Sequence, residues 1–426
     1  MKKAGELNIF RAFRSPNYTL YFIGRSVSQF GTWMQRTAVV WVVYSITHSA
    51  FLLGVTIFAE QFPSFLFSML GGVAADRYDR YKIIKIMQVL SMAQAVALAV
   101  IVIAAHNIVW PIIALSVLLG IINAFDVPAR QSLIHEVVAN PADLPNALSL
   151  TTAMASLAQL LGPALSGIVL NAFGAATCFI INATSFGAVI VSILLMKLPP
   201  PKPRNREKKV VTELIEGFTY LKKVPNIRLT ILMLAIVSLL LLPYNTVLPV
   251  FAKVIFKGDA STFGYINSFI GIGAVVGTVF LAACKPNAPL KKILLISTLL
   301  LSGGLICFSQ TKNFPLAMLF AALTGFGSIA QFTISNIIIQ SESATEMRGR
   351  VISILLMAIF GMTPLGSLVV GAVSERIGAP ATVLYEGIIG IIISIAFVKF
   401  LTKSTKSEIK TDIISEENEQ VITEQL

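Results

Sequence analysis

The feature that most constrains this chain is the length of its uncharged stretches. Residues 86–125 and 144–196 contain no Asp, Glu, Lys or Arg. About 20 consecutive apolar residues are enough for a helix to cross the hydrocarbon core of a bilayer. Each stretch therefore predicts two crossings, with breaks near 106–107 and 171–174. Across the chain 55% of residues are hydrophobic, 13% are charged and the mean hydropathy is +0.80, which excludes an ordinary soluble protein.

The distribution of apolar residues predicts an all-α integral membrane protein with twelve transmembrane helices. The expected spans are 18–44, 50–75, 83–105, 109–127, 147–171, 175–197, 227–251, 262–284, 292–310, 314–340, 351–374 and 379–401. The basic N-terminus is not followed by a short apolar core and a small-residue cleavage site. We therefore expect the first span to be retained.

The net charge of +12 reflects membrane topology. If both termini are cytoplasmic, most of the 33 Lys and Arg residues lie on the cytoplasmic side. The exceptions are Lys253, Lys257, Lys312 and Arg376 outside, and Arg25 and Arg36 within the first span. This asymmetry follows the positive-inside rule. It predicts a multi-pass protein of the cell membrane and does not indicate a nucleic-acid partner.

A proline-rich and charged segment divides the chain into two halves. This segment lies at the start of residues 198–226. An amphipathic pattern follows at 212–223, and it predicts a short helix on the inner membrane surface. We expect an N-terminal unit at 1–197, a C-terminal unit at 227–402 and a disordered cytoplasmic tail at 403–426.

The two halves also show a weak internal similarity. Residues 74–77 align with 282–285, and residues 162–163 align with 363–364. Internal repeats of this kind predict two pseudo-symmetric six-helix bundles.

A charged turn joins the expected second and third spans, and it carries Gly72, Asp76, Arg77, Arg80 and Lys82. This pattern resembles the loop between the second and third helices of major facilitator superfamily transporters. The resemblance implies an inner gate in which such groups, with Asp126 and Arg130 of the fourth span, latch the outward-facing state. On this basis we expect Arg77 and Arg80 to reach Asp126. The alternative is a positive-inside anchor with local ion pairs.

Two further motifs resemble the same superfamily. Arg348 and Arg350 match an Arg-Gly-Arg turn at the corresponding inner loop of the second half, which implies a pseudo-symmetric gate partner; a generic basic turn is the alternative. Gly162, Pro163 and Gly167 resemble a fifth-helix motif found mostly in antiporters that export. Here the alternative is a plain packing kink.

A polar stripe runs along the first span. At about 100° per residue, Arg25, Gln29, Thr32 and Arg36 lie within one narrow arc, which should face protein or a watery cavity. The resemblance implies that the first, fourth, seventh and tenth helices line this cavity. Their polar residues are Asn123, Tyr244, Asn245, Gln331 and Asn336. We expect Gln29, Arg36 and Gln331 to contact cargo or cavity water, while Arg25 has the alternative of contacting loops at the inner rim.

Glu60 is the only acid deep in the second span and is a candidate for proton coupling, since burial favours the protonated form of a carboxyl group. An ion pair with Arg36 is the competing interpretation, and the two can coexist. Glu386 in the last span is a second, weaker candidate.

No enzyme chemistry is indicated. The three histidines fall at loops, no glycine-rich phosphate loop is present, and Cys178, Cys284 and Cys307 are too scattered for a metal site or a disulfide framework. We expect no cofactor and no metal, and a monomer whose partners are a small molecule, protons and lipid.

Residues 28–35, 126–131 and 144–149 are similar to the branch that contains enterobactin exporters and macrolide efflux proteins. Many members of that branch carry an acid where this chain has Thr32, which favours Glu60 as the protonation site. The resemblance implies a proton-coupled exporter of drugs, macrolides or siderophores that works by rocker-switch alternating access. An uptake symporter, a lipid flippase and a transport-inactive sensor are the alternatives.

Overall fold

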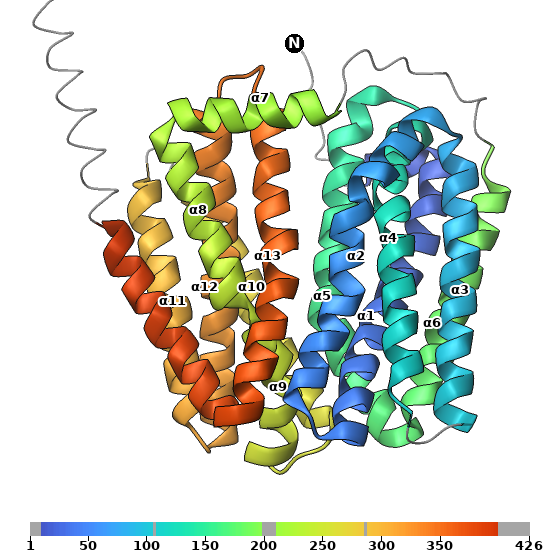
Figure 1. Cartoon of the computed structure of the whole chain (residues 1–426). Coiled ribbons are helices and arrows are strands. Elements are labelled where there is room, and N and C mark those ends of the chain that lie inside the picture. Colours follow the sequence, from blue (N-terminus) through green and yellow to red (C-terminus); the bar gives the residue numbers. More distant parts are fainter. Residues whose placement is uncertain (1–9, 105–107, 198–209, 285–287, 399–426) are drawn as a thin grey trace, which may run out of the picture.

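The computed structural model describes residues 10–104, 108–197, 210–284 and 288–398, and within these ranges the chain is helical and contains no strand (Figure 1). The first half forms α1 (Pro16–Thr47), α2 (Ala50–Arg77), α3 (Arg80–Ala104), α4 (Trp110–Val137), α5 (Leu144–Phe173) and α6 (Ala175–Leu195). The second half forms α7 (Val210–Lys223), α8 (Pro225–Leu240), α9 (Leu248–Val250), α10 (Ala260–Ala282), α11 (Leu290–Gln310), α12 (Phe314–Glu342), α13 (Arg348–Ile377) and a last helix, Ala379–Val398.

Within the described ranges, 11 helical segments are long and apolar enough to cross a membrane. They correspond to every expected span except the first. With 32 residues, α1 is also long enough to cross, but polar residues such as Arg25, Gln29 and Arg36 lower its mean hydropathy. The stripe that makes α1 a candidate site thus also makes it the least apolar of the long helices.

The seventh expected span is not one continuous helix. After α8 the chain forms a 3-10 segment at Leu242–Val247, the short α9 and a π-helical turn at Phe251–Ile255. Pro243 and Pro249 lack the backbone N–H that a continuous α-helix requires. The span expected at 227–251 is present as the helical segment Pro225–Ile255, and its α-helix is regular only as far as Leu240.

Figure 1 shows the helices in two groups, with α1–α6 on one side and α8–α13 with the last helix on the other. The first group is held by packing of α2 on α4 and of α1 and α3 on α6, and the second by packing of α10 and α11 on α12. The two groups meet mainly where α2 packs on α13 and α5 packs on α10. These pairs determine how the groups can move relative to each other.

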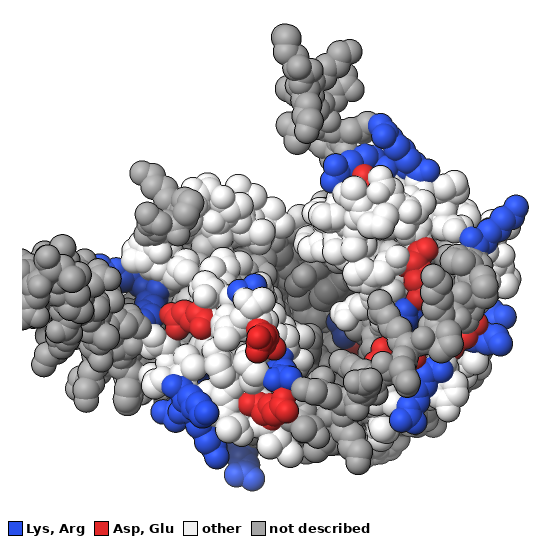
Figure 2. All heavy atoms as spheres, turned by 90° about the horizontal axis from the view of Figure 1, so that it is seen from above, with Lys and Arg blue, Asp and Glu red and all other residues white. Residues whose placement is uncertain are grey.

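The contacts between the groups lie at the end opposite α7. A Cβ on Gly371 would be 3.2 Å from the Cα of Gly54, and a Cβ on Gly264 would be 3.1 Å from the Cα of Gly167. Glycine permits this approach because no side chain separates the helix backbones. At the α7 end the ribbons diverge in Figure 1, and Figure 2 shows the surface hollowed between the two groups.

A chain of buried amides ties the first group together. The Gln35 amide donates to Gln94 Oε1 at 3.0 Å and accepts from Asn182 Nδ2 at 2.8 Å. Gln94 in turn donates to the carbonyl of Leu115 at 3.2 Å. This chain connects α1, α3, α4 and α6, and its groups are paired within the protein, as a buried polar network requires.

The charged turn begins at two glycines with different surroundings. A Cβ on Gly71 would lie 1.8 Å from the carbonyl oxygen of Ala124 on α4, whereas nothing lies within 4 Å of a Cβ on Gly72. Gly71, which sequence reasoning missed, is therefore the glycine that allows α2 and α4 to pack. In this conformation Gly72 makes no such contact.

We predict that Gly71→Ala destabilises the protein by about 1–3 kcal/mol, because the added methyl forces α2 away from α4. Gly72→Ala is the matched control and should leave stability unchanged or slightly raised, since alanine favours helix. Thermal unfolding of the purified proteins in detergent, followed by tryptophan fluorescence, measures both. Equal midpoints for the two variants would contradict the assignment.

Candidate functional site

Glu375 closes the end of the molecule opposite α7. From α13 its Oε2 accepts hydrogen bonds from the backbone N–H of Ala50 at 2.7 Å, the N–H of Phe51 at 3.2 Å and the hydroxyl of Ser49 at 3.2 Å. These donors form the N-terminus of α2, where the helix dipole favours a negative charge. The carboxylate therefore fastens one helix group to the other. No sequence motif pointed to Glu375, because its partners lie more than 320 residues away.

The glycines of the fifth-helix motif also lie at contacts between helices. A Cβ on Gly162 would lie 2.5 Å from the Cβ of Trp33 on α1, and Gly167 lies against Ala260 and Gly264 of α10. The hydroxyl of Ser268 on α10 donates to the carbonyl of Leu160 at 3.2 Å. The motif glycines thus lie at two helix contacts, one within the first group and one between the groups.

At the α7 end of the first group, Arg80 pairs with Glu136 and donates to the carbonyl of Ala75 at 2.9 Å. The structure thus differs from the expectation that Arg80 reaches Asp126. The reason is depth, because Asp126 lies ten residues, or about 15 Å, before Glu136 along α4. Arg77 and Lys82 are exposed at the surface, and Asp76 is half-buried in the last turn of α2.

Asp126 is almost fully buried and has two partners of its own. It pairs with Arg130 one turn later on α4 and accepts a hydrogen bond from Gln88 of α3 at 3.0 Å. Arg80 and Asp126, which the sequence placed in one relay, therefore belong to two separate ion pairs.

In the second group, the Arg-Gly-Arg turn is bound by α7. Arg350 pairs with Glu216 at 2.9 Å, and the Tyr220 hydroxyl accepts a hydrogen bond from the N–H of Ala344 at 3.1 Å. Arg348, half-buried at the start of α13, has an Nε without a hydrogen-bond partner among the described residues. The amphipathic helix expected at the membrane surface thus packs, in part, on protein (Figure 1).

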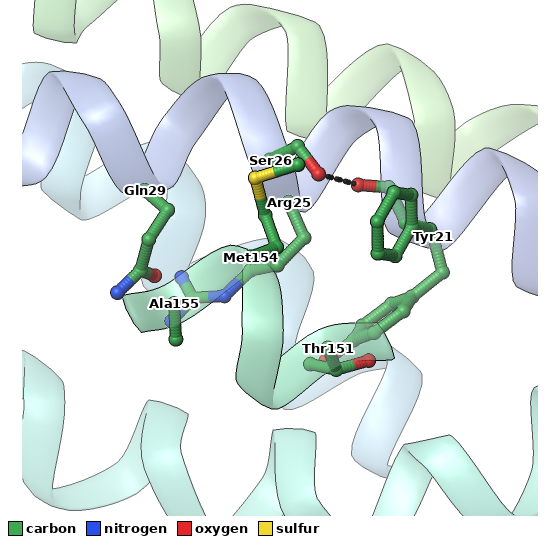
Figure 3. A pocket seen from close by; sticks show the side chains of 8 residues that line it. Tyr21, Arg25, Ser26, Gln29, Thr151, Met154 and Ala155 are labelled. Carbon is green, nitrogen blue, oxygen red and sulfur yellow. Dashed lines mark hydrogen bonds between the residues drawn. The ribbon is translucent and has the colours of Figure 1, made fainter. Parts of the chain in front are cut away.

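The polar stripe of α1 divides into two parts. Arg36 pairs with Glu60 of α2 at 2.5 Å and lies over the ring of Trp33. Nearer the α7 end, Arg25 and Gln29 line a pocket between α1 and α5 (Figure 3). Thr32, between them, donates to the carbonyl of Ser28 in its own helix at 2.8 Å.

The other expected cavity residues are less uniform. Asn123 is half-buried, Asn245 is exposed and donates to the carbonyl of Leu242, and Asn336 accepts from Gln340. Gln331 and Tyr244 are fully enclosed. The structure therefore does not place Gln331 in contact with cavity water in this conformation.

Glu386 lies buried in the last helix, and within the described residues neither carboxylate oxygen has a hydrogen bond. Tyr244 is within electrostatic range of Glu386 and within hydrogen-bonding range of Ser328. The described ranges contain no group of three or more His, Cys, Asp or Glu residues that could hold a metal ion.

A sequence profile described as transmembrane secretion effector matches residues 8–426. The chain is 26% identical to the staphyloferrin A transporter of Staphylococcus aureus, covering 92% of this chain and 98% of that protein. It is 24% identical to the multidrug efflux pump Tap of Mycobacterium tuberculosis, over 87% of this chain and 90% of Tap. It is also 24% identical to the enterobactin exporter EntS of Shigella boydii, over 82% and 83%.

Solved structures show the same fold at low sequence identity. A point mutant of the nucleoside transporter NupG superposes with a TM-score of 0.75 at 13% identity, covering 90% of this chain and 99% of that protein. A bacterial homologue of the lysosomal transporter Spinster, in its inward-facing and unoccupied conformation, gives a TM-score of 0.68 at 15% identity, covering 89% and 96%.

We predict that Glu375→Ala shifts the protein toward a state open at the end opposite α7. Glu375→Ala removes a carboxylate that accepts three hydrogen bonds from the other helix group. The equilibrium constant between the closed and open states of this end should therefore change about tenfold, which corresponds to ~1.4 kcal/mol. Spin labels at exposed Phe173 and Lys312, in a background without the native cysteines, report the separation of the groups at that end.

Arg376→Ala, the neighbouring exposed position, is the control and should leave the distance distribution as in the parent. A Glu375→Ala distribution identical to the parent's would show that the glycine contacts alone hold this end closed.

Proposed function

The chain belongs to the transmembrane secretion effector family of major facilitator transporters, and we propose that it exports small amphipathic molecules as a secondary active transporter. It is a multi-span membrane transporter and not an enzyme. Export is supported by two relatives whose names describe an efflux pump and an exporter, and by Gly162, Pro163 and Gly167 at the helix contacts described above. Drugs, macrolides and siderophores are the proposed cargo classes.

We propose twelve crossings in two six-helix bundles, α1–α6 and α8–α13 with the last helix, joined by a linker at 198–226 that carries α7. The α7 end is assigned to the cytoplasm, together with both termini. The support is the gathering of Lys and Arg side chains around that face in Figure 2, as the positive-inside rule requires. The protein is proposed to act as a monomer in the cell membrane.

The observation that carries the mechanism is one-sided closure. Contacts between the bundles at Glu375, Gly54 and Gly167 all lie at the outer end, while a Cβ on Gly72 or Gly349 at the inner end would meet nothing within 4 Å. Rocking of one bundle on the other would open the outer end and bring the inner ends together. In that state the charged turn at Asp76 and the Arg348–Arg350 turn would serve as the inner gate.

Proton coupling is proposed at the Arg36–Glu60 pair. The pair joins α1 to α2 within one bundle, and an ion pair in a membrane span is a site where protonation or an incoming ligand changes the balance of charge. A proton on Glu60 would release Arg36 toward the cavity. Glu386 is the second candidate, because its carboxyl group is buried without a hydrogen bond among the described residues.

Everted membrane vesicles test export and coupling together. A panel of macrolides and siderophores is added to vesicles with an imposed proton gradient, which a pH-sensitive dye reports. We expect at least one compound to dissipate the gradient, and Glu60→Gln to abolish that response. Glu346→Gln, at an exposed site on an inner loop, is the control and should respond as the parent does.

Accumulation of the same compounds in right-side-out vesicles, with no response in everted ones, would replace export by uptake. Transfer of labelled lipid between leaflets without any response to the panel would instead identify a flippase.

A double substitution separates coupling from structure at the same pair. If the pair is only structural, Arg36→Gln combined with Glu60→Gln removes both charges and should recover most of the transport lost in either single variant. We predict that the double variant recovers thermal stability while proton-driven transport stays at least about tenfold below that of the parent. Unfolding midpoints and initial transport rates are measured on the same preparations.

A further inference from the structure

Arg25 is a charged residue deep in a membrane helix. It lies nine residues after the start of α1 at Pro16, which places it about 14 Å along the helix axis. A charge at that depth is costly unless it meets a partner or water, so an arginine there indicates a functional site.

Three acids of the first helix group have other basic partners. Glu60 pairs with Arg36, Glu136 pairs with Arg80, and Asp126 pairs with Arg130. Among the described residues the Arg25 guanidinium itself makes no hydrogen bond or ion pair, and the Tyr21 hydroxyl lies within electrostatic range of it.

On its other side, Arg25 faces a second small cavity that Gln88 and Arg130 also line. The region therefore holds two guanidinium groups against the single carboxylate of Asp126. One of these positive charges, that of Arg25, has no ion-pair partner in the part of the chain that the structure describes.

The pocket at Arg25 offers mainly donors. Two of its hydroxyl groups donate their protons to backbone carbonyls: Ser26 donates to Phe22 at 2.7 Å and Thr151 donates to Ala147 at 2.9 Å. The guanidinium of Arg25 and the amide of Gln29 remain as the groups with N–H to offer, and a guanidinium matches the two oxygens of a carboxylate or phosphate. Figure 3 shows Arg25 running beside Met154, with the ends of the Arg25 and Gln29 side chains near Ala155 of α5.

The pocket is small, with a volume of about 50 Å³. By this measure a cavity of about 10–15 Å³ is enough to hold one water molecule. The pocket therefore has room for one anionic group and not for a whole drug-sized molecule, whose remainder would lie in the hollow between the two bundles.

We propose that Arg25 and Gln29 form an anion subsite, which binds a carboxylate or phosphate group presented from the α7 side. The inference rests on the proposed export function and narrows its cargo to molecules that carry such a group. The same chemistry occurs in a soluble organic acid and in a lipid headgroup, and the experiment distinguishes these two sources.

The test is anion binding by the full-length protein in nanodiscs of zwitterionic phosphatidylcholine. Citrate and inorganic phosphate are titrated against chloride at equal ionic strength, and the thermal unfolding midpoint is recorded. We expect citrate or phosphate to raise the midpoint of the parent. Arg25→Gln should weaken the apparent affinity about tenfold or more, since charge-assisted hydrogen bonds are lost. Arg25→Lys should keep part of it, because the charge remains but the planar fork does not.

Arg14→Gln, an exposed arginine just before α1, is the matched control and should bind as the parent does. If Arg25→Gln fails to fold, Gln29→Ala is the second variant in which the anion affinity of the same pocket is measured. A midpoint that rises only in discs containing anionic phosphatidylglycerol, and only when Arg25 is present, would support the subsite with a lipid headgroup as its occupant.

No rise with any of these anions, or an equal rise in Arg25→Gln, would overturn the subsite. Because this assay requires no transport, its failure alongside an intact response in everted vesicles removes the subsite and leaves export in place. Anion binding without any vesicle response removes export instead.

Discussion

Hydrocarbon provides no hydrogen bonds and little screening, so a charge or an unpaired backbone group within it costs several kcal/mol. This constraint explains the helical fold and the placement of most polar side chains. Gln35, Gln94 and Asn182 satisfy one another, while Arg36 and Asp126 have partners of opposite or complementary charge. Among the described residues the Arg25 guanidinium has no such partner, and it therefore carries the proposal about the chemistry of the cargo.

Different kinds of interaction hold the two ends of the molecule. At the end opposite α7 the two helix groups are joined by close backbone approach at glycines and by one carboxylate at a helix terminus, and these contacts cross from one group to the other. At the α7 end the Arg80–Glu136 pair lies within the first group, whereas the Arg350–Glu216 pair joins the second group to α7. Each bundle can therefore keep its inner charges paired while the distance between the bundles changes.

Much of this arrangement could be predicted from the sequence. Uncharged stretches located the spans, and the amphipathic pattern at 212–223 located α7 to within two residues of its start. The sequence also indicates the Arg36–Glu60 pair as one of two interpretations of Glu60, because both residues lie at similar depth on adjacent helices. The break after α8 could have been predicted from Pro243 and Pro249. The high hydropathy of the surrounding segment instead favoured a single uninterrupted span.

The sequence does not predict which face of each helix meets its neighbour, or which residues pair when they lie far apart in the chain. Gly71 and Gly72 differ by one position, yet one position turns a helix by about 100°, so only one of them faces α4. Glu136 and Glu375 find their partners across helix contacts that no local pattern encodes.

The amide chain of Gln35, Gln94 and Asn182 bears on how relatives of this protein can diverge. Gln35 donates to one neighbour and accepts from the other, so replacing any member leaves another buried amide without its partner. Substitution at one of the three positions is therefore tolerated mainly when another changes with it. These positions, on three different helices, should covary among relatives even though none of them touches cargo.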